Sequence, residues 1–357
     1  MAVVLSAFAG GQDADAPLGA IDTDWGSRVL EFDFPAIKIG IAEYPDGPTG
    51  ATVLHFPDGA AMAMDVRGGS PGVVGEYGYV HAISLAGGSL FGLEAAAGVT
   101  AGLLERQETA ARWDTIPLVS GGIVFDFGGR DNNVYPDKRL GGAALDNAKV
   151  GRFPLGARGA GIAVTVGNGF AFDRGEQAGQ GAAFRELGGI KIFACTVVNA
   201  IGAVFNRDGK VVLGHLDPET GKRTTFAEDL ERRLDALRAP NADRSSRVSS
   251  AGVRTRSVLD RVAPATRLAS VRESAGQNTT LTVVVTNQTM RGHDLEQLGR
   301  QVHSSMARAI QPFHTRDDGD VLWMVSTAEV DVPEWSLTAL GVAASEVVWD
   351  AVLEAHP

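Results

Sequence analysis

The chain has 357 residues, of which 44% are hydrophobic and 21% are charged, a balance typical of a globular protein with a large core. Its 32 basic and 43 acidic residues give a net charge of −11, which argues against nucleic acid or an anionic membrane as the main partner. One cysteine, Cys195, excludes an internal disulfide, and its apolar neighbours predict a core residue rather than a nucleophile. The apolar N-terminus lacks a basic region, and no segment reaches the roughly 18 apolar residues of a membrane span. We therefore expect a cytoplasmic protein.

The first half of the chain predicts a large sheet and one buried helix. Residues 37–66 form strands interrupted by Pro-Asp-Gly turns at 45–50 and 57–60. Residues 87–107 predict a buried helix that carries Leu90, Leu93, Ala97 and Leu104 at helical spacing. Gly92, Gly98 and Gly102 in the same segment are expected to permit close approach to a neighbour. Further strands are expected within 116–127, 161–172, 190–205 and 210–216, the last two separated by a turn at 206–209.

The second half begins with an Arg-rich segment, 220–277, that is only weakly helical around 226–239 and is interpreted as a solvated connection. Residues 293–311 predict a helix that Pro312 ends, with its apolar face made by Leu295, Leu298, Val302, Met306 and Ile310. A strand at 323–332 and a helix at 336–355 follow. Because strands and helices come in groups, an α+β fold with helices outside the sheets is favoured, although length alone leaves one or two domains open.

Three motif types do not predict a catalytic, metal or nucleotide site in this sequence. Residues 68–72 match G-x-S-x-G, the nucleophile elbow of α/β-hydrolases, but Pro71 and the glycines that follow predict a loop instead of the required helix. The seven histidines show no metal-ligand spacing, and His303 and His314 are expected to satisfy local hydrogen bonds. No glycine pattern indicates a nucleotide site. We expect no metal and no other cofactor.

Asp318 and Asp320 lie two residues apart, just before a predicted strand. If that segment is extended, both carboxylates face the same side and can share a task. The simpler interpretation is an Asp-Gly turn at the surface, and this stretch by itself favours the turn.

Asn278, Thr279 and Thr280 precede the apolar run 281–285. One interpretation is a plain strand entry, since threonine is β-branched. The other is autoproteolysis, in which the Thr279 hydroxyl attacks the Asn278 carbonyl and the resulting ester is hydrolysed. The freed Thr279 amine, with an intrinsic pKa of about 7.7 to 8.0, would then serve as the base for its own hydroxyl.

Long blocks of the chain resemble the P1 group of N-terminal-nucleophile hydrolases, peptidase family S58, and in particular the nylon-oligomer (6-aminohexanoate oligomer) endohydrolases. The resemblance covers most of the chain except the Arg-rich segment, and the blocks that carry it include EFDFPAIKIGIAEYPDGPTGATVLHFP, AISLAGGSLFGLEAAAGVTAGLLER, VYPDKRLG, GQGAAFRELG, AGQNTTLTVVVTN, QVHSSMARAIQPFHTRDDGD and TALGVAASEVVWDAVLEA.

This resemblance implies a four-layer αββα sandwich that forms a single domain, 1–357, cleaved into fragments 1–278 and 279–357. It implies that Thr279 is the nucleophile, that Asn278 supplies the carbonyl that is cut and that the Asn199 amide stabilises the oxyanion. Asp318 and Asp320 then match an acidic pair that holds the nucleophile. A homo-oligomer, often a tetramer, is also implied.

Two positions depart from these relatives. Asn168 lies where they have a lysine, and Phe125 lies where they have a tyrosine. Without the nearby ammonium, the Thr279 amine should be more basic and oxyanion stabilisation should depend more on Asn199. The expected substrate is a linear amide such as a 6-aminohexanoate oligomer. The alternatives are an aminopeptidase acting on β-amino-acid or small L-peptides, a pantetheine-type amide hydrolase and, further away, an acyltransferase.

Overall fold

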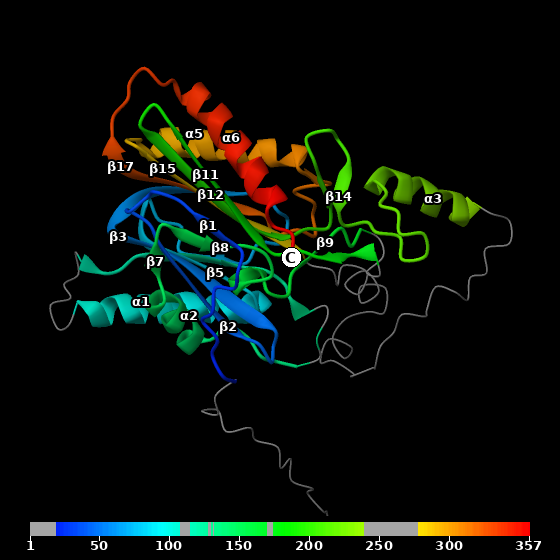
Figure 1. Ribbon diagram of the computed structural model, residues 1–357, viewed down its shortest axis with the longest axis horizontal. Coiled ribbons are helices and arrows are strands. Elements are labelled where there is room, and N and C mark those ends of the chain that lie inside the picture. The colour runs from blue at the N-terminus through cyan, green and yellow to red at the C-terminus, as the bar shows by residue number, and fades with distance from the viewer. Residues whose placement is uncertain (1–18, 108–114, 128–129, 131, 170–173, 239–277) are drawn as a thin grey trace, which may run out of the picture.

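The computed structural model describes residues 19–107, 115–127, 130, 132–169, 174–238 and 278–357. Two pairs of helices enclose the strands, with α5 (Gly292–Ser305) and α6 (Leu337–Leu353) on one side and α1 (Glu94–Arg106) and α2 (Lys138–Asp146) on the other (Figure 1). The predicted αββα layering is therefore confirmed.

The longest strand, β3 (Thr49–Val66), belongs to both halves of the sheet structure. Its first residues pair with β2 (Lys38–Tyr44) and β5 (Tyr79–Ala86), and its last residues pair with β17 (Val321–Val330). The half on the α5 and α6 side has the order β11 (Gln180–Leu187), β12 (Ile190–Asn199), β15 (Thr279–Gln288) and β17. The other half continues from β3 and β5 to β6 (Val119–Ile123) and β4 (Val73–Val74).

Short elements complete the fold: β1 (Val29–Glu31), β7 (Lys149–Val150), β8 (Arg152–Pro154), β9 (Thr165–Val166), β10 (Glu176–Gln177), β13 (Ala203–Phe205), β14 (Val211–Leu213), β16 (Ile310–Gln311), α3 (Phe226–Arg238) and the 3-10 turns η1 (Ser89–Leu93), η4 (Gly159–Gly161) and η8 (Met306–Arg308). The expected turn at 206–209 is present, since β13 and β14 pair on either side of it.

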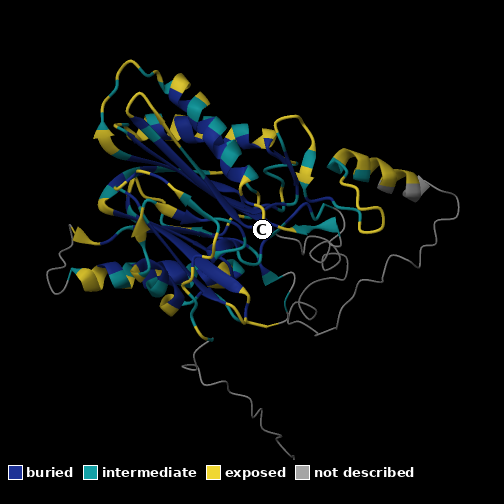
Figure 2. Ribbon diagram, in the orientation of Figure 1, coloured by how far each residue is buried: buried dark blue, intermediate teal, exposed yellow. Residues whose placement is uncertain are grey.

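The two halves pack face to face through their central strands, where most residues are buried (Figure 2). The indole of Trp323 on β17 donates to the Ser120 hydroxyl of β6 over 2.8 Å. A side chain at Gly122 would lie 2.6 Å from the same indole, so the facing strand needs glycine there. Cys195 is also buried, and burial raises the pKa of its thiol, as expected of an inert core residue.

The face expected for the helix at 87–107 was wrong. Residues 89–93 form the turn η1, Leu90 and Leu104 are exposed, and the buried positions of α1 include Ala95, Gly98 and Val99. A Cβ at Gly98 would come within 2.1 Å of the Lys138 carbonyl in α2. Helix α1 therefore packs through its small residues, because they let α2 approach closely.

Two further boundaries differ from expectation. The turn predicted at 57–60 is an irregularity inside β3, whose pairing with β5 shifts between His55 and Ala60. The helix predicted at 293–311 ends at Ser305, and Ile310 belongs to β16, although all five predicted apolar residues are buried. Of the Arg-rich segment, residues 226–238 form the helix α3, and 239–277 lie outside the described residues.

Candidate active site

Thr279 is the first residue of β15, between two strands that bring other polar residues to the same place. Across the sheet it is opposite Asn199, the last residue of β12. On its other side, β15 runs parallel to β17, and Asp318, Gly319 and Asp320 immediately precede β17. A parallel bridge joins Asn278 to Asp318. Strand order therefore gathers residues that are far apart in the sequence.

Two donors hold the carbonyl oxygen of the peptide bond between Asn278 and Thr279. The Thr279 hydroxyl donates to the Asn278 carbonyl oxygen over 2.7 Å. The backbone N–H of Gly319 donates to the same oxygen, also over 2.7 Å. Both residues of the bond are only 3% exposed. A nucleophilic hydroxyl and a hydrogen-bond donor thus meet at one buried peptide carbonyl.

The two carboxylates beside this bond are buried and accept several hydrogen bonds each. Asp320 accepts from the Thr280 N–H at 2.8 Å and from the backbone and ring of His314 at 2.9 and 3.1 Å. Asp318 accepts from the hydroxyl and N–H of Thr315 at 2.6 and 3.3 Å and from the N–H of Ile201 at 3.3 Å. Burial, followed by the negative charge of Asp320, raises the pKa of Asp318 to about 7. One of these carboxylates is therefore suited to carry a proton near neutral pH.

Asp318 and Asp320 were expected to hold Thr279 directly. In the uncleaved chain the hydrogen bonds of Asp320 reach the neighbouring residue Thr280 instead. Asp320 holds the residue after Thr279, and the hydroxyl of Thr279 donates to the carbonyl before it. The surface Asp-Gly turn favoured by the local sequence does not occur, because Asp318 is 1% exposed and Asp320 is fully buried.

Asn199, Asn168 and Phe125 all lie at this site. The Asn199 side-chain amide donates to the Phe125 carbonyl over 2.9 Å and accepts from the Thr165 N–H over 3.2 Å. Since an amide nitrogen carries two hydrogens, one N–H of Asn199 is left for an oxyanion. Asn168 donates to the Thr165 hydroxyl over 3.3 Å, so it supports Asn199 through Thr165.

Behind Asp320 lie two neighbouring imidazoles, which the sequence predicted only as groups that satisfy local hydrogen bonds. The rings of His303 and His314 meet edge to face, with centroids 4.3 Å apart. His303 bonds through Nδ1 to Asp65 at 2.9 Å, and burial lowers the pKa of His303. Asp65 in turn pairs with Arg67 at 2.6 Å. The neutral ring of His303 therefore packs against the imidazole that bonds Asp320.

A pocket of about 210 Å³ opens beside Thr279. The loop at 68–72 forms one side of it, and a Cβ at Gly319 would lie 2.6 Å from the Thr279 hydroxyl and 2.8 Å from the Ser70 carbonyl. The short strand β4 follows this loop, so the nucleophile elbow is excluded as expected. The remaining lining residues come from η1 and from the end of β6: Ser89, Leu90, Ile123 and Phe125.

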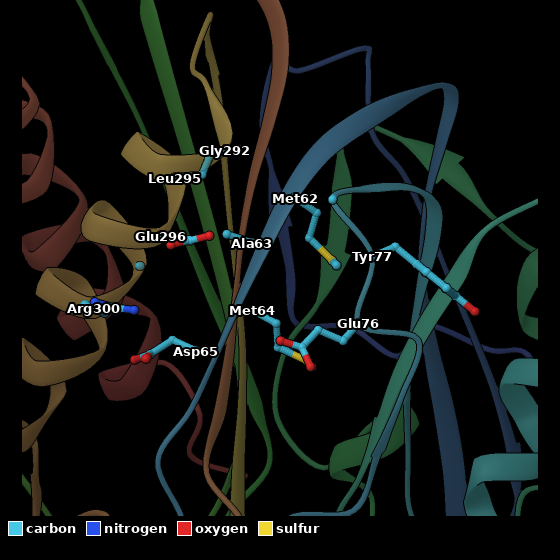
Figure 3. Close-up of a pocket in the computed structure, with 12 residues that line it drawn as sticks. Met62, Ala63, Met64, Asp65, Glu76, Tyr77, Gly292, Leu295, Glu296 and Arg300 are labelled. Carbon is cyan, nitrogen blue, oxygen red and sulfur yellow. The ribbon is translucent and has the colours of Figure 1, made fainter.

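A larger cavity, about 460 Å³, lies between β3, α5 and the 76–78 loop (Figure 3). Glu296 and Arg300 project from α5 toward β3, with Glu76 and Tyr77 on the opposite side. Asp65 also lines it. Within the described residues, no group of three or more His, Cys, Asp or Glu side chains is arranged to hold a metal ion.

Three features of the site were missed in the sequence: the Gly319 N–H, the loop at 68–72 and His314. Gly319 acts through its backbone N–H, and the loop at 68–72 acts through its position beside Gly319. Neither property can be recognised from the type of a single residue. His314, six residues before Asp320, could have been noticed as the histidine nearest the acidic pair.

A family model described as peptidase family S58 matches residues 32–356. The chain belongs to peptidase family S58. The 6-aminohexanoate-oligomer endohydrolases of Agromyces sp. (strain KY5R) and Paenarthrobacter ureafaciens are each 44% identical to it over 340 residues, which cover 92% of this chain and 86% of theirs. This S58 member is accordingly a hydrolase of amide bonds.

Solved structures agree with this family at the level of the fold. A β-aminopeptidase from Burkholderia sp. matches with a TM-score of 0.57 and 16% identity, covering 92% of this chain and 88% of that one. The L-aminopeptidase D-Ala-esterase/amidase of Ochrobactrum anthropi, described as a variant of the Ntn hydrolase fold, gives 0.57 and 15%, covering 95% and 88%. The S58 chain therefore has the Ntn-hydrolase-like fold that its sequence predicted.

Over the described part of this S58 chain, no helix combines the length and the apolar character that a membrane crossing requires. The homotetramer and the cytoplasmic location expected from the sequence stay predictions.

Proposed function

We propose that this protein is a self-cleaving amidohydrolase whose nucleophile is Thr279, acting on linear amides of the 6-aminohexanoate-oligomer type. The observation that carries the proposal is the Thr279 hydroxyl, 2.7 Å from the carbonyl oxygen of the preceding residue, in a chain of this family. That carbonyl also accepts the Gly319 N–H.

Self-cleavage begins when the Thr279 Oγ rotates from the carbonyl oxygen to attack the carbonyl carbon of Asn278. The negative charge that develops on the oxygen is stabilised by the Gly319 N–H already bonded to it. The C–N bond breaks as the proton lost by the Thr279 hydroxyl passes to the Thr279 nitrogen, which leaves an ester between Asn278 and the Thr279 Oγ and a free Thr279 amine. Water then hydrolyses this ester, so fragments 1–278 and 279–357 are no longer joined by a covalent bond.

The same residue then hydrolyses the substrate. The free Thr279 amine takes the hydroxyl proton, and Oγ attacks the substrate carbonyl at the place that the Asn278 carbonyl occupied. The Gly319 N–H and the free N–H of Asn199 face the oxyanion. Asp318, with a pKa raised to about 7, can accept and return a proton during the two steps. The substrate C–N bond then breaks as its nitrogen takes the proton held by the Thr279 amine, and the product amine leaves an ester on Oγ. Water hydrolyses that ester, which releases the acyl group as a carboxylate and restores the Thr279 hydroxyl.

The proposed substrate follows from the two endohydrolases, whose names specify 6-aminohexanoate oligomers. Asn168 and Phe125 replace a lysine and a tyrosine of those relatives, so oxyanion stabilisation here falls to Asn199 and Gly319. Both replacements are neutral, and the hydroxyl nucleophile and its own amine base are retained.

The direct test is the mass of the purified protein under denaturing conditions. We expect two fragments, the smaller beginning Thr-Thr-Leu-Thr, and a single inactive chain for Thr279→Ala. The loss of activity should exceed 10³-fold, because nucleophile and base are removed together. A Thr279→Ala variant that hydrolyses amides at the normal rate would overturn the mechanism.

An aminopeptidase is the second candidate, and the fold shared with the Burkholderia β-aminopeptidase favours it. The two activities differ in their products. An aminopeptidase releases single N-terminal residues, whereas an endohydrolase releases a mixture of oligomers from a long linear amide.

A further inference from the structure

The loop 165–169, which carries Asn168, is bonded to the segment that carries Asn199. Alternate N–H groups of this loop donate to the Asn199 side-chain carbonyl and to the backbone carbonyls of the next two residues, over 3.2, 3.0 and 3.2 Å. The donors are Thr165, Gly167 and Gly169, and the two backbone acceptors are Ala200 and Ile201. Because the loop holds the Asn199 side-chain oxygen, it also fixes the direction in which the N–H groups of that amide point.

His215 is fully buried and lies against this loop. Its φ is 51°, in a left-handed region that histidine adopts more readily than most residues. The His215 N–H donates to the Gly167 carbonyl over 3.1 Å. A Cβ at Gly167 would lie 2.4 Å from the His215 backbone nitrogen, and a Cβ at Gly169 would lie 3.1 Å from its Nε2. The backbone and the ring of His215 therefore contact both residues that flank Asn168, and any shift of the loop changes these contacts.

His215 is held in turn by the residues that follow it and by Arg174. Its carbonyl accepts from the Thr224 N–H over 3.2 Å and from the Arg174 guanidinium over 3.4 Å. The same guanidinium pairs with Asp229 of α3 at 2.5 Å, and both side chains are at most 13% exposed. The Phe226 ring lies 5.8 Å from the imidazole, between centroids. The segment 214–229 thus forms a support on which the loop with Asn168 rests.

The two oxyanion donors of the site have separate supports. Strand β15 lies between β12, which ends at Asn199, and β17, which follows Gly319. In the uncleaved chain the Asn278 carbonyl accepts from Gly319, whereas the Asn199 amide donates to the Phe125 carbonyl. Self-cleavage therefore depends on Gly319, and the support from His215 acts on the Asn199 donor.

We propose that His215 is a positioning residue for substrate hydrolysis, which holds the 165–169 loop so that the free N–H of Asn199 points at the substrate oxyanion. This rests on the proposed function, because the oxyanion forms when Thr279 attacks the substrate. The segment 214–229 then belongs to the framework of the active site, although its second half was predicted as part of a solvated connection.

The first test is His215→Asn, because asparagine also accepts a left-handed backbone while the imidazole ring is lost. We expect kcat on a 6-aminohexanoate oligomer to fall about tenfold or more and KM to change less than about threefold, since an oxyanion contact acts in the transition state. Self-cleavage, followed by mass over time, should keep its wild-type rate. An unchanged kcat, or self-cleavage slowed as much as hydrolysis, overturns the positioning role.

A double-mutant cycle tests the route through Asn199. Asn199→Ala alone should lower kcat by about 100-fold. Adding His215→Asn to it should lower kcat less than about twofold further, because the group through which His215 acts is already gone. A further loss of about tenfold in the double variant would show a general structural effect and overturn this route.

Asp229→Asn probes the same support without changing the buried ring, so it decides the matter where His215→Asn fails to fold. It weakens the pairing with Arg174 and should lower kcat about threefold while the normal fragments form. His55→Asn is the matched control, since His55 is also buried but belongs to the part of β3 that pairs with β2. Its kcat should change less than about twofold, and a fall as large as that of His215→Asn contradicts a specific role.

The wild-type protein separates this proposal from the proposed function. A wild-type chain that stays intact and hydrolyses no amide loses both. A wild-type enzyme of two fragments whose kcat is matched by the His215 and Asp229 variants keeps the Thr279 mechanism and loses only the positioning role.

Discussion

The cavity between β3 and α5 and the pocket beside Thr279 differ in size and in chemistry, and the smaller one has the features of an active site. The 460 Å³ cavity presents the charged side chains of Asp65, Glu76, Glu296 and Arg300. The 210 Å³ pocket is neutral and reaches the Thr279 hydroxyl. Volume and charge by themselves would favour the 460 Å³ cavity as the active site. Within the described chain, however, only the 210 Å³ pocket lies beside a nucleophilic hydroxyl that is bonded to a carbonyl and has two buried carboxylates near it. Catalysis needs positioned groups more than space.

The largest effect on the site beside Thr279 is expected from Gly319→Ala. The added Cβ would lie 2.6 Å from the Thr279 hydroxyl and 2.8 Å from the Ser70 carbonyl, so the hydroxyl must move away from the Asn278 carbonyl. We expect self-cleavage to slow about 100-fold or more, in line with the loss of an aligned donor or nucleophile. The fraction of intact chain, followed by mass over time, measures it.

The matched control is Gly142→Ala, since a Cβ at Gly142 in α2 meets no atom within 4 Å. That variant should cleave normally. Wild-type cleavage of Gly319→Ala would show that this close approach does not constrain the nucleophile, whereas a folded and intact chain supports it.

A smaller effect is expected from the side-chain contacts that run from Asp65, in the larger cavity, to Asp320. Asp65 lines the larger one and bonds His303, whose ring packs on His314, the residue that bonds Asp320. His314→Ala removes one donor to a buried carboxylate, and such a bond contributes about 1.5 to 3 kcal/mol. We expect kcat to fall at least tenfold with little change in KM.

Two measurements distinguish this positioning role from a general loss of structure. In His314→Ala the acid limb of the pH profile of kcat should move to higher pH, because the carboxylate pair loses a donor to its charged form. His314→Asn places an N–H near the Nδ1 position and should restore most of the rate. Glu296→Gln, in the larger cavity without this connection, should change kcat less than twofold. An Asn variant as slow as the Ala variant would contradict the role.

The sequence predicted the positions of the strands better than the contacts between elements that are distant in the sequence. The apolar run after Thr280 predicted β15, which begins at Thr279 as expected. The close approach expected at Gly98 is confirmed, because Gly98 and Gly141 bring α1 and α2 into backbone contact. The apolar face expected for the helix was wrong, because the periodicity within one helix does not say which face meets its neighbour. Interactions between distant segments decide such faces.

In the active site, too, the residues could be identified from the sequence, but the contacts that depend on the fold could not. The family resemblance indicated Thr279, Asn199, Asp318 and Asp320, and the fold brings all four to neighbouring strand ends. The local sequence alone favoured a surface turn for the acidic pair. The Gly319 N–H could not be predicted, because every residue except proline has that group and only its distance from Asn278 distinguishes it. The neutral character of the pocket likewise depends on which side chains converge, and these come from the separate segments 70–72, 89–90 and 123–125.

The smallest predicted effect is the pH dependence that Asp318 gives to the free energy of unfolding. The pKa of Asp318 is raised from 3.8 to about 7 by burial and by Asp320. Between these values the folded chain holds a proton that the unfolded chain has released, so the free energy of unfolding falls as pH rises. This group contributes a slope of up to about 1.4 kcal/mol per pH unit, and the full penalty is reached above about pH 7.

Asp318→Asn should remove that slope. The comparison is made in the uncleaved Thr279→Ala background, by urea unfolding at pH 4.5, 5.5 and 6.5, so that fragment separation does not enter. The free energy of unfolding should decline less steeply with pH in the double variant than in its parent. Asp317→Asn, at a partly exposed carboxylate that pairs with Arg316, should leave the parent slope unchanged. Parallel curves for the Asp318 variant and its parent would mean that Asp318 is already ionised at pH 4.5, and the proton carrier of the proposed mechanism would have to be another group.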